Sequence, residues 1–200
     1  WGGLILGGIL VWFVWDLPKI EDMGPAADKA RRPGVTILAA DASLIAGYGD
    51  LYGRRLGVNE LPPELIQAVV AIEDRRFLEH PGVDFRGLLR AVVVNLRAGG
   101  IVQGGSTLTQ QLAKNLFLTP ERSYQRKIKE LLLALALENR FDKDELLTIY
   151  LNRVYLGAGT YGVEAAAQRY FGISAREVDT YQAAILAGLL RAPSRLNPDN

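Results

Sequence analysis

The spacing of apolar positions changes once along the chain, and the change divides it into two regions. Residues 35–49, VTILAADASLIAGYG, hold two short apolar runs on either side of Asp41-Ala42-Ser43, which predicts a β-hairpin. From Pro62 onward, apolar residues recur with helical spacing almost to the end. Helices are expected over residues 62–77, 85–98, 107–117, 123–141, 143–155, 162–170 and 178–190. The predicted class is therefore mainly α.

The N-terminal stretch has a different character. Its first fifteen residues, WGGLILGGILVWFVW, carry no charge and end in Trp12 and Trp15, which suit a membrane interface. They are fewer than the roughly 20 apolar residues that a span needs. Because the chain starts on Trp rather than Met, we expect a truncated transmembrane anchor over residues 1–18. A signal peptide is the alternative, but no clear small-x-small cleavage site follows closely. Residues 19–60 are expected to form a linker that includes the hairpin.

Charge is distributed unevenly although the net charge of the 200-residue chain is only +1. Residues 73–130 carry ten Lys or Arg against six Asp or Glu, whereas the rest carries thirteen against sixteen. A basic middle indicates an anionic partner there. The chain has no Cys, which excludes disulfides, thiolate catalysis and cysteine-based metal sites.

A carboxylate interrupts the apolar face of the predicted helix 62–77. On a helical wheel Glu73 lies among Val69, Val70 and Phe77. Such a carboxylate is either a buried group neutralised by an arginine or a general base tuned by its surroundings.

A second carboxylate, Glu130, repeats this arrangement. The segment RKIKELLLALALE, residues 126–138, is apolar all round after Glu130, which predicts a fully buried helix. Arg126 and Lys127 precede Glu130 by one turn and can hold it ionised. A structural ion pair is the alternative for Glu130 alone, but two carboxylates on core faces with a basic surround favour a functional site.

The segment AGGIVQGGSTLTQQLAKN, residues 98–115, lies between the two carboxylates. Its four glycines predict a flexible loop whose backbone can approach a ligand. Thr107 and Gln110 match a capping box, so a helix N-terminus, which attracts anions, is expected directly after the loop. Lys114 follows two turns along, but the G-K-[ST] ending of a P-loop is missing.

The predicted helix 85–98 is basic and amphipathic. Arg86, Arg90 and Arg97 line one side, and Leu89 and Leu96 belong to the other. Such a helix lies in a membrane interface or packs on the protein's own core, and the pattern favours neither. The single histidine, which follows the helix 62–77, is expected to be structural rather than a metal ligand.

Five motifs become recognisable together in one order. They are EDRRFLEHPG at Glu73, GGSTLTQQLAKN at Gly104, RKIKE at Arg126, KDELLTIYLNRVYLGAGTYG at Lys143 and RAP at Arg191. With them the chain resembles the peptidoglycan glycosyltransferase domain of class A penicillin-binding proteins and the monofunctional transglycosylases. One departure is Leu156, where the family often has an aromatic residue before the glycine.

The resemblance implies a lysozyme-like helical lobe with a smaller membrane-associated jaw lobe, about residues 83–120, in a glycosyltransferase domain over residues 61–200. It implies a single-pass protein of the bacterial cytoplasmic membrane whose catalytic domain lies on the extracytoplasmic face. The implied partners are lipid II, the growing glycan chain, membrane lipid, a transpeptidase domain in a longer chain and other cell-wall synthesis proteins, but no nucleic acid. A divalent cation, Mg²⁺ or Mn²⁺, is implied as an aid to the reaction, and no organic cofactor.

The resemblance also carries residue roles onto this sequence. Glu73 would be the base that deprotonates the acceptor's 4-hydroxyl, and Glu130 would orient or support the diphosphate end of the donor. The residues that would bind the donor and its diphosphate are Ser106, Thr107, Gln110, Gln111, Lys114, Arg122, Arg126 and Lys127. The residues that would support the motifs are Asp74, Phe77, His80, Gly82, Asn115, Tyr150, Asn152, Gly157, Gly159, Tyr161, Gly162, Arg191 and Pro193.

The chemistry distinguishes this function from its rivals. A diphosphate leaves as a stabilised anion and needs positive charge more than a proton, whereas a glycoside hydrolase also needs a strong general acid. The rivals are a lysozyme-like hydrolase or lytic transglycosylase acting on finished glycan, and a membrane-tethered interaction domain without chemistry. Neither S-x-x-K nor K-T-G occurs, so the chain carries no penicillin-reactive serine motif, and we expect it to be part of a longer bifunctional protein.

Overall fold

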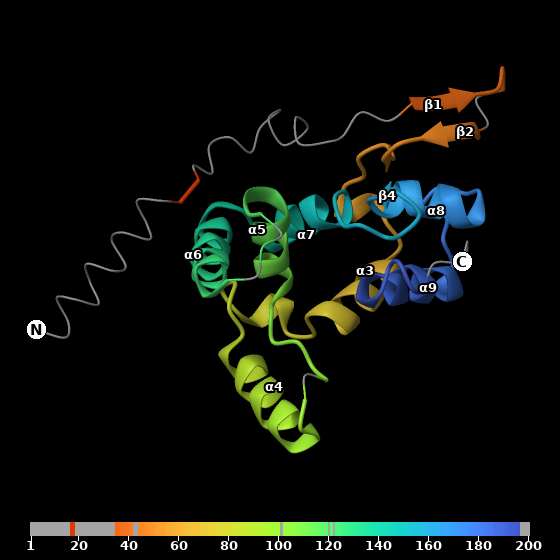
Figure 1. Ribbon diagram of the computed structural model, residues 1–200. Coiled ribbons are helices and arrows are strands. Elements are labelled where there is room, and N and C mark those ends of the chain that lie inside the picture. The colour runs from red at the N-terminus through yellow and green to blue at the C-terminus, as the bar shows by residue number, and fades with distance from the viewer. Residues whose placement is uncertain are drawn as a thin grey trace, which may run out of the picture. The chain divides into compact units, whose positions relative to one another are not determined.

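The computed structural model (Figure 1) describes residues 17–18, 35–41, 44–100, 102–119, 121 and 123–196. The chain divides into two compact units, one of residues 1–24 and 76–143 and the other of residues 25–75 and 144–200. The predicted anchor lies outside the described residues except for Leu17 and Pro18. Within the described ranges, no helix is both long enough and apolar enough to cross a membrane.

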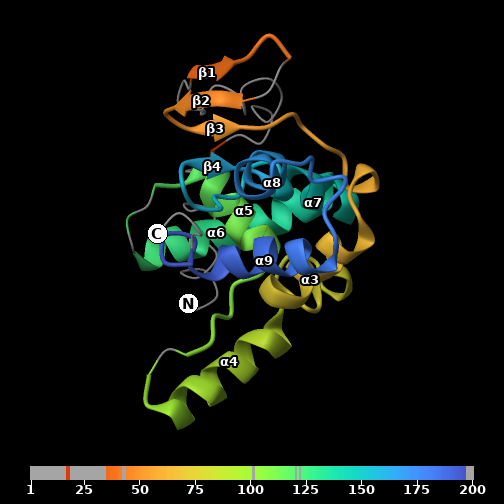
Figure 2. The same cartoon turned by 90° about the vertical axis from the view of Figure 1, so that its right-hand side faces the viewer.

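In the first unit, the residues that the structure describes form a short 3-10 helix and three α-helices. They are η3 (Phe77–Glu79), α4 (Phe85–Ala98), α5 (Leu108–Phe117) and α6 (Tyr124–Arg140). Helices α5 and α6 lie side by side (Figure 1) and bury leucines such as Leu112 and Leu133. Asp84 is the N-cap of helix α4, and its carboxylate accepts hydrogen bonds from Gly87 N and from the Arg76 guanidinium, each at 2.9 Å. From there α4 extends away from α5 and α6 (Figures 1 and 2).

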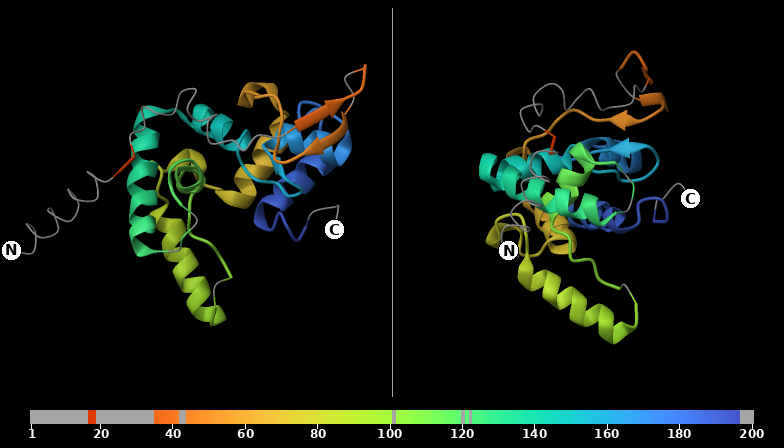
Figure 3. Two further views of the ribbon diagram at one scale, coloured as in Figure 1. Left: turned by 45° about the horizontal axis from the view of Figure 1, so that its top comes forward. Right: turned by 60° about the vertical axis from the view of Figure 1, so that its left-hand side comes forward.

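The second unit combines short strands with helices. They are β1 (Val35–Leu38), β2 (Leu44–Tyr48), β3 (Leu51–Tyr52), η2 (Val58–Glu60), α3 (Pro63–Glu73), β4 (Thr160–Tyr161), α8 (Val163–Phe171) and α9 (Thr180–Arg191). Helix α7 (Lys143–Leu151) begins at the last residue of the first unit and continues in this one. The first two strands pair antiparallel, seen as orange arrows in Figure 3, and β3 pairs parallel with β4 (Figure 2). Helices α3 and α9 pack together around Leu65, Val69 and Leu186.

Most helix ends lie within two residues of their predicted positions, but two predictions were wrong. Helix α3 ends at Glu73 rather than Phe77, because Asp74 leaves helical geometry with φ −159° and ψ 80°. Helix α7 ends at Leu151 rather than near Tyr155. There the Asn152 side chain pairs with the backbone of Leu56, accepting from Leu56 N at 2.9 Å and donating to Leu56 O at 2.7 Å.

The prediction that α6 is buried all round was also wrong. One row, which includes Glu130, Ala134 and Leu137, is buried, whereas Leu135 is 39% exposed. Because α5 covers one side of α6, the apolar residues on the opposite side remain accessible to solvent. The continuous apolar run in α6 therefore does not mean that the helix is buried on all sides.

Candidate active site

Glu73 is the last residue of α3 and lies on the same side of the helix as its buried residues. Leu65 and Val69, at eight and four positions before it, are almost completely buried, and Glu73 itself is half-buried. Asp74 follows at the helix end, where its N–H donates to Val70 O at 2.9 Å and its side chain is buried. The placement of Glu73 on the core face of its helix agrees with the wheel.

In the second unit, the charge of Glu73 affects the ionisation of the Tyr150 phenol. Its side chain on α7 is almost completely buried. Burial raises the pKa of the Tyr150 phenol far above its ordinary value, and the negative charge of Glu73 raises that pKa further. The phenol therefore stays protonated, as a potential hydrogen-bond donor, throughout the physiological pH range.

Glu130 is a carboxylate held by two cations in the first unit. It is only 3% exposed. One carboxylate oxygen accepts a hydrogen bond from Arg126 Nη1, and the other accepts one from Lys127 Nζ at 2.8 Å. Lys127 Nζ also donates to Ser106 Oγ at 2.7 Å, which ties α6 to the loop before α5. The structure thus brings together Ser106, Arg126, Lys127 and Glu130.

The predicted capping box at the start of α5 is present. Thr107 N donates to Gln110 Oε1 and Gln110 N donates to Thr107 Oγ1, both at 3.2 Å. The Thr107 hydroxyl donates in turn to Gly82 O at 2.6 Å. Both side chains are buried, so they build the helix start, whereas Ser106, Gln111 and Lys114 are half-buried.

Positive charge predominates on the two packed helices α5 and α6. Lys114 on α5 forms no ion pair with any residue that the structure describes. Arg126 and Lys127 share a single carboxylate, that of Glu130. Predicted donor residue Arg122 lies outside the described residues, and Asn115 is exposed. Because the positive charges of Lys114, Arg126 and Lys127 outnumber the single negative charge of Glu130, this part of α5 and α6 suits an anion with several charges.

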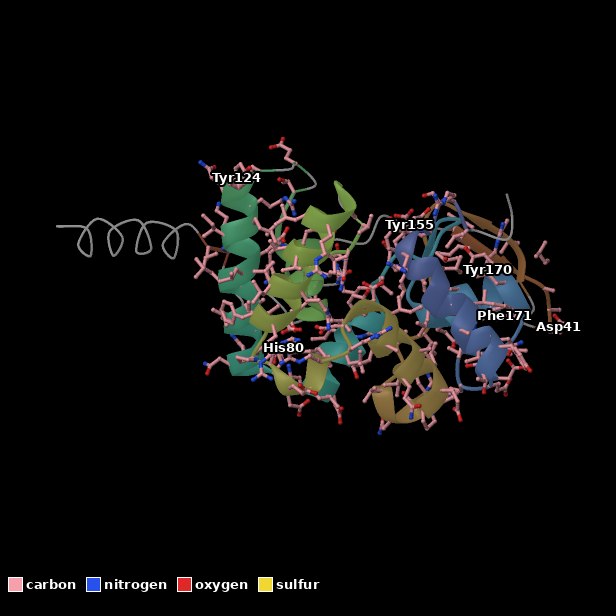
Figure 4. All side chains as sticks on the ribbon, turned by 90° about the horizontal axis from the view of Figure 1, so that it is seen from below. Asp41, His80, Tyr124, Tyr155, Tyr170 and Phe171 are labelled. Atoms are coloured by element: carbon pink, nitrogen blue, oxygen red, sulfur yellow. The ribbon has the colours of Figure 1, made fainter. Side chains whose placement is uncertain are left out.

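His80 belongs to the first motif and lies in the first unit. The ring is buried, its Nδ1 accepts a hydrogen bond from Gly82 N at 3.2 Å, and its edge meets the Phe77 ring. Figure 4 shows His80 at the opposite end of α6 from Tyr124. Across the described ranges, no group of three or more His, Cys, Asp or Glu side chains could hold a metal ion.

The supporting residues in the second unit make close backbone contacts. Gly157 has φ +92°, and a Cβ there would lie 2.5 Å from Pro193 O. Gly162 has φ +86°, and a Cβ there would lie 2.8 Å from Asn152 O. The fourth motif therefore meets the fifth motif at Gly157 and folds back on itself at Gly162. The remaining members are Gly159 with φ +73°, Tyr161 stacked on Tyr52 at 5.2 Å, and the exposed Arg191.

The sequence patterns did not identify two further candidate residues, Glu138 and Lys143. Glu138 lies outside every motif, and Lys143 begins the fourth motif without an assigned role. They form a salt bridge with 2.7 Å between Lys143 Nζ and Glu138 Oε2. Their spacing of five residues does not place them on one face of a continuous helix, so no helical pattern could reveal the pair.

Comparison with known proteins defines the class. The family profile described as Transglycosylase matches residues 43–200. Penicillin-binding protein 1A of Escherichia coli K12 is 46% identical over 181 residues, covering 90% of this chain and 21% of that protein. Penicillin-binding protein 1A of Aquifex aeolicus VF5 is 55% identical over 143 residues, covering 72% of this chain and 20% of that protein. The chain thus spans about a fifth of the length of these relatives.

A crystal structure of penicillin-binding protein 1A from Haemophilus influenzae matches with 26% identity and a TM-score of 0.42, over 84% of this chain and 15% of that one. From the family match, the chain belongs to the transglycosylase family, the peptidoglycan glycosyltransferase domains of class A penicillin-binding proteins. This confirms the resemblance and the enzyme class predicted from the five motifs.

Proposed function

We propose that this domain polymerises lipid II, the lipid-linked disaccharide-pentapeptide, with Glu73 as general base. The 4-hydroxyl oxygen of the acceptor attacks C1 of the donor sugar from the face opposite the diphosphate. The hydroxyl proton passes to the Glu73 carboxylate. The bond between C1 and the diphosphate oxygen breaks, and undecaprenyl diphosphate leaves with its electron pair, which inverts the anomeric centre.

The cluster around Glu130 supports this reaction most directly. Its two cations are held in place by a buried carboxylate, and Lys127 also binds Ser106 of the second motif. Donors fixed before the reaction stabilise a developing anion without reorganisation at the moment of bond cleavage. In this proposal Lys114, Arg122, Arg126 and Lys127 bind the diphosphate, and Glu130 keeps two of them oriented.

Helix α4 supports a membrane-associated jaw lobe beside a lysozyme-like lobe. Leu89 and Leu96 are 67% and 77% exposed. Packing on the protein's own core would have buried these side chains. An exposed apolar face flanked by Arg86 and Arg90 is suited to the interface of a membrane that holds the lipid substrate. The proposed location is the extracytoplasmic face of the bacterial cytoplasmic membrane, with a transpeptidase domain in a longer chain and other cell-wall synthesis proteins as partners.

A divalent cation is not given a step in this proposal. The described residues offer no cluster of carboxylates or histidines that would bind one. Mg²⁺ or Mn²⁺ would therefore have to be held chiefly by the oxygens of the substrate's diphosphate. The cationic side chains described above carry the stabilisation of the leaving group.

The experiment that tests the base is the substitution Glu73→Gln, assayed with labelled lipid II. General base catalysis contributes about 10²- to 10⁴-fold, so polymerisation should fall by that factor. Thermal stability should stay equal or rise, because a half-buried charge is removed. The matched control is Glu64→Gln, an exposed carboxylate in the first turn of the same helix. A folded Glu73→Gln variant with full activity would assign the base to another residue.

A second assay separates the rival functions. The parent chain is incubated with labelled lipid II, with and without moenomycin, and in parallel with purified sacculi. Moenomycin-sensitive glycan strands are expected from lipid II. Soluble muropeptides released from sacculi, without polymer from lipid II, would instead favour a hydrolase or lytic transglycosylase. Inactivity on both substrates would favour a non-catalytic interaction domain.

A further inference from the structure

A partly buried ion pair in the first unit joins three helices. The Glu138 carboxylate, on α6, accepts a hydrogen bond from Lys143 Nζ at 2.8 Å to Oε1, and its Oε2 lies 2.7 Å from the same nitrogen in a salt bridge. Its Oε1 also accepts a hydrogen bond from the Thr109 hydroxyl of α5 at 2.6 Å. The Glu138 side chain is only 7% exposed. Two charges therefore connect α5, α6 and the start of α7.

Lys143 also contacts the segment that follows Glu73. Its ammonium donates a hydrogen bond to His80 O at 2.7 Å and lies 4.5 Å from the centroid of the Phe77 ring, within cation–π range. Phe77 and His80 belong to EDRRFLEHPG, the motif that begins with Glu73. One ammonium thus contacts this segment at two points.

A second connection joins the same segment to α5. The Thr107 hydroxyl, at the N-terminus of α5, donates to Gly82 O at 2.6 Å. Gly82 is bonded in turn to the His80 ring, through a 3.2 Å hydrogen bond from Gly82 N to Nδ1. Residues 77–82 are therefore attached to α5 in two ways, directly at Thr107 and through the ion pair at Thr109.

The charged character of this pair has a physical consequence. Buried ion pairs often add little stability relative to apolar groups of the same volume. An apolar pair could fill the space of Glu138 and Lys143, but it could not donate to a carbonyl oxygen or accept from a hydroxyl. The charged groups instead hold residues 77–82, α5 and α6 in a fixed arrangement.

We propose that Glu138 and Lys143 are positioning residues for sugar transfer. They fix the segment that continues from the Glu73 base against the helix that carries donor-binding side chains. This inference rests on the proposed function, and neither residue is assigned a contact with substrate. Loss of the pair would let residues 77–82 move relative to α5, which should lower turnover more than it weakens binding.

The test compares kcat and KM for lipid II in three variants of the full chain. Lys143→Met/Glu138→Leu removes both charges, and Lys143→Arg keeps the cation. Arg176→Met removes an exposed ion pair with Glu60 in the second unit and serves as control. In the double variant kcat should fall about tenfold to a hundredfold while KM stays within about twofold. Lys143→Arg should recover most of the lost kcat, and Arg176→Met should match the parent.

A second measurement does not depend on activity. Amide hydrogen exchange in residues 77–84 and 107–112 should be at least about tenfold faster in the double variant, with exchange in α9 unchanged. A folded double variant with parental kcat and parental exchange would overturn the positioning role alone. A parent chain that does not polymerise lipid II would overturn the proposed function.

One further variant applies if the double variant does not fold. Thr109→Val removes one hydroxyl and leaves the ion pair in place. It should lower kcat by a smaller factor than the double variant and leave KM unchanged. A folded Thr109→Val variant with parental kcat would overturn the positioning role.

Discussion

The ammonium of Lys127 donates a hydrogen bond to the Ser106 hydroxyl at 2.7 Å while it also binds Glu130 Oε2 at 2.8 Å. The two partners come from separate motifs, Ser106 from the loop before α5 and Glu130 from α6. A lysine ammonium has three donors and no acceptor. Two of the three are used, so one N–H remains for a phosphate oxygen of the donor.

The first prediction concerns this lysine. Lys127→Met should raise KM for lipid II by about tenfold to a hundredfold, because a hydrogen bond to a charged group contributes about 1.5–3 kcal/mol. The loss of polymerisation rate should therefore be largest when lipid II is limiting. Arg140→Met, a change of an exposed cation at the other end of α6, should leave KM unchanged. Equal KM values for the parent and Lys127→Met would remove Lys127 from the donor site.

The second prediction compares two glycines. Gly82 has φ +94°, and a Cβ there would lie 2.9 Å from Ala134 O, so Gly82→Ala should destabilise the protein by about 1–3 kcal/mol. Gly188 lies inside α9, and apart from its chain neighbours and the backbone of its own helix no atom lies within 4 Å of an added Cβ. Gly188→Ala should therefore stabilise the protein by about 0.5–1 kcal/mol. Urea unfolding measures both changes, and a neutral Gly82→Ala would show that the contact with α6 can relax.

Periodicity predicted where most helices lie but not how the chain leaves them. Phe77 fits the apolar row of α3, so the pattern predicted a helix through it. The backbone instead turns at Asp74, and Phe77 is buried in the first unit as part of η3. The β3–β4 pairing was not predicted either, because strands of two residues are too short to show an alternating pattern.

The candidate site likewise has some features that the sequence predicted and others that it did not. The local elements followed from sequence spacing: the Thr107–Gln110 capping box and the one-turn contacts of Arg126 and Lys127 with Glu130. The Glu138–Lys143 pair and the bond from Thr107 to Gly82 did not, because they depend on how helices pack. The spacing of residues in one sequence predicts which side chains are neighbours within a helix. It predicts partners on different helices only where a family motif supplies them.

The third prediction tests membrane contact by α4. The chain has no Cys, so a single cysteine can be introduced and labelled with an environment-sensitive fluorophore. Labels at Leu89→Cys and Leu96→Cys should shift their emission to the blue when anionic vesicles are added, because these exposed positions enter the interface. A label at Ile45→Cys, which is exposed in β2, should not shift. Equal responses at all three sites would argue against docking through α4.

The fourth prediction follows from the buried phenol of Tyr150. Burial raises its pKa far above the ordinary value of about 10, and the charge of Glu73 raises it further. Above about pH 10 the unfolded chain releases this proton while the folded chain keeps it. The free energy of unfolding should therefore fall by about 1.4 kcal/mol per pH unit from this group as the pH rises beyond that value.

The measurement is the thermal midpoint from about pH 8 to about pH 11, in the parent and in Tyr150→Phe. The variant has no proton to lose at this position, so its stability should decline less steeply above about pH 10. Tyr181→Phe, a change of a tyrosine on α9 that is exposed to solvent, serves as control and should keep the parental slope. Identical slopes for the parent and Tyr150→Phe would mean that the Tyr150 phenol ionises without unfolding. The expected difference in slope would show that the residue electrostatically linked to Glu73 remains protonated in the folded protein.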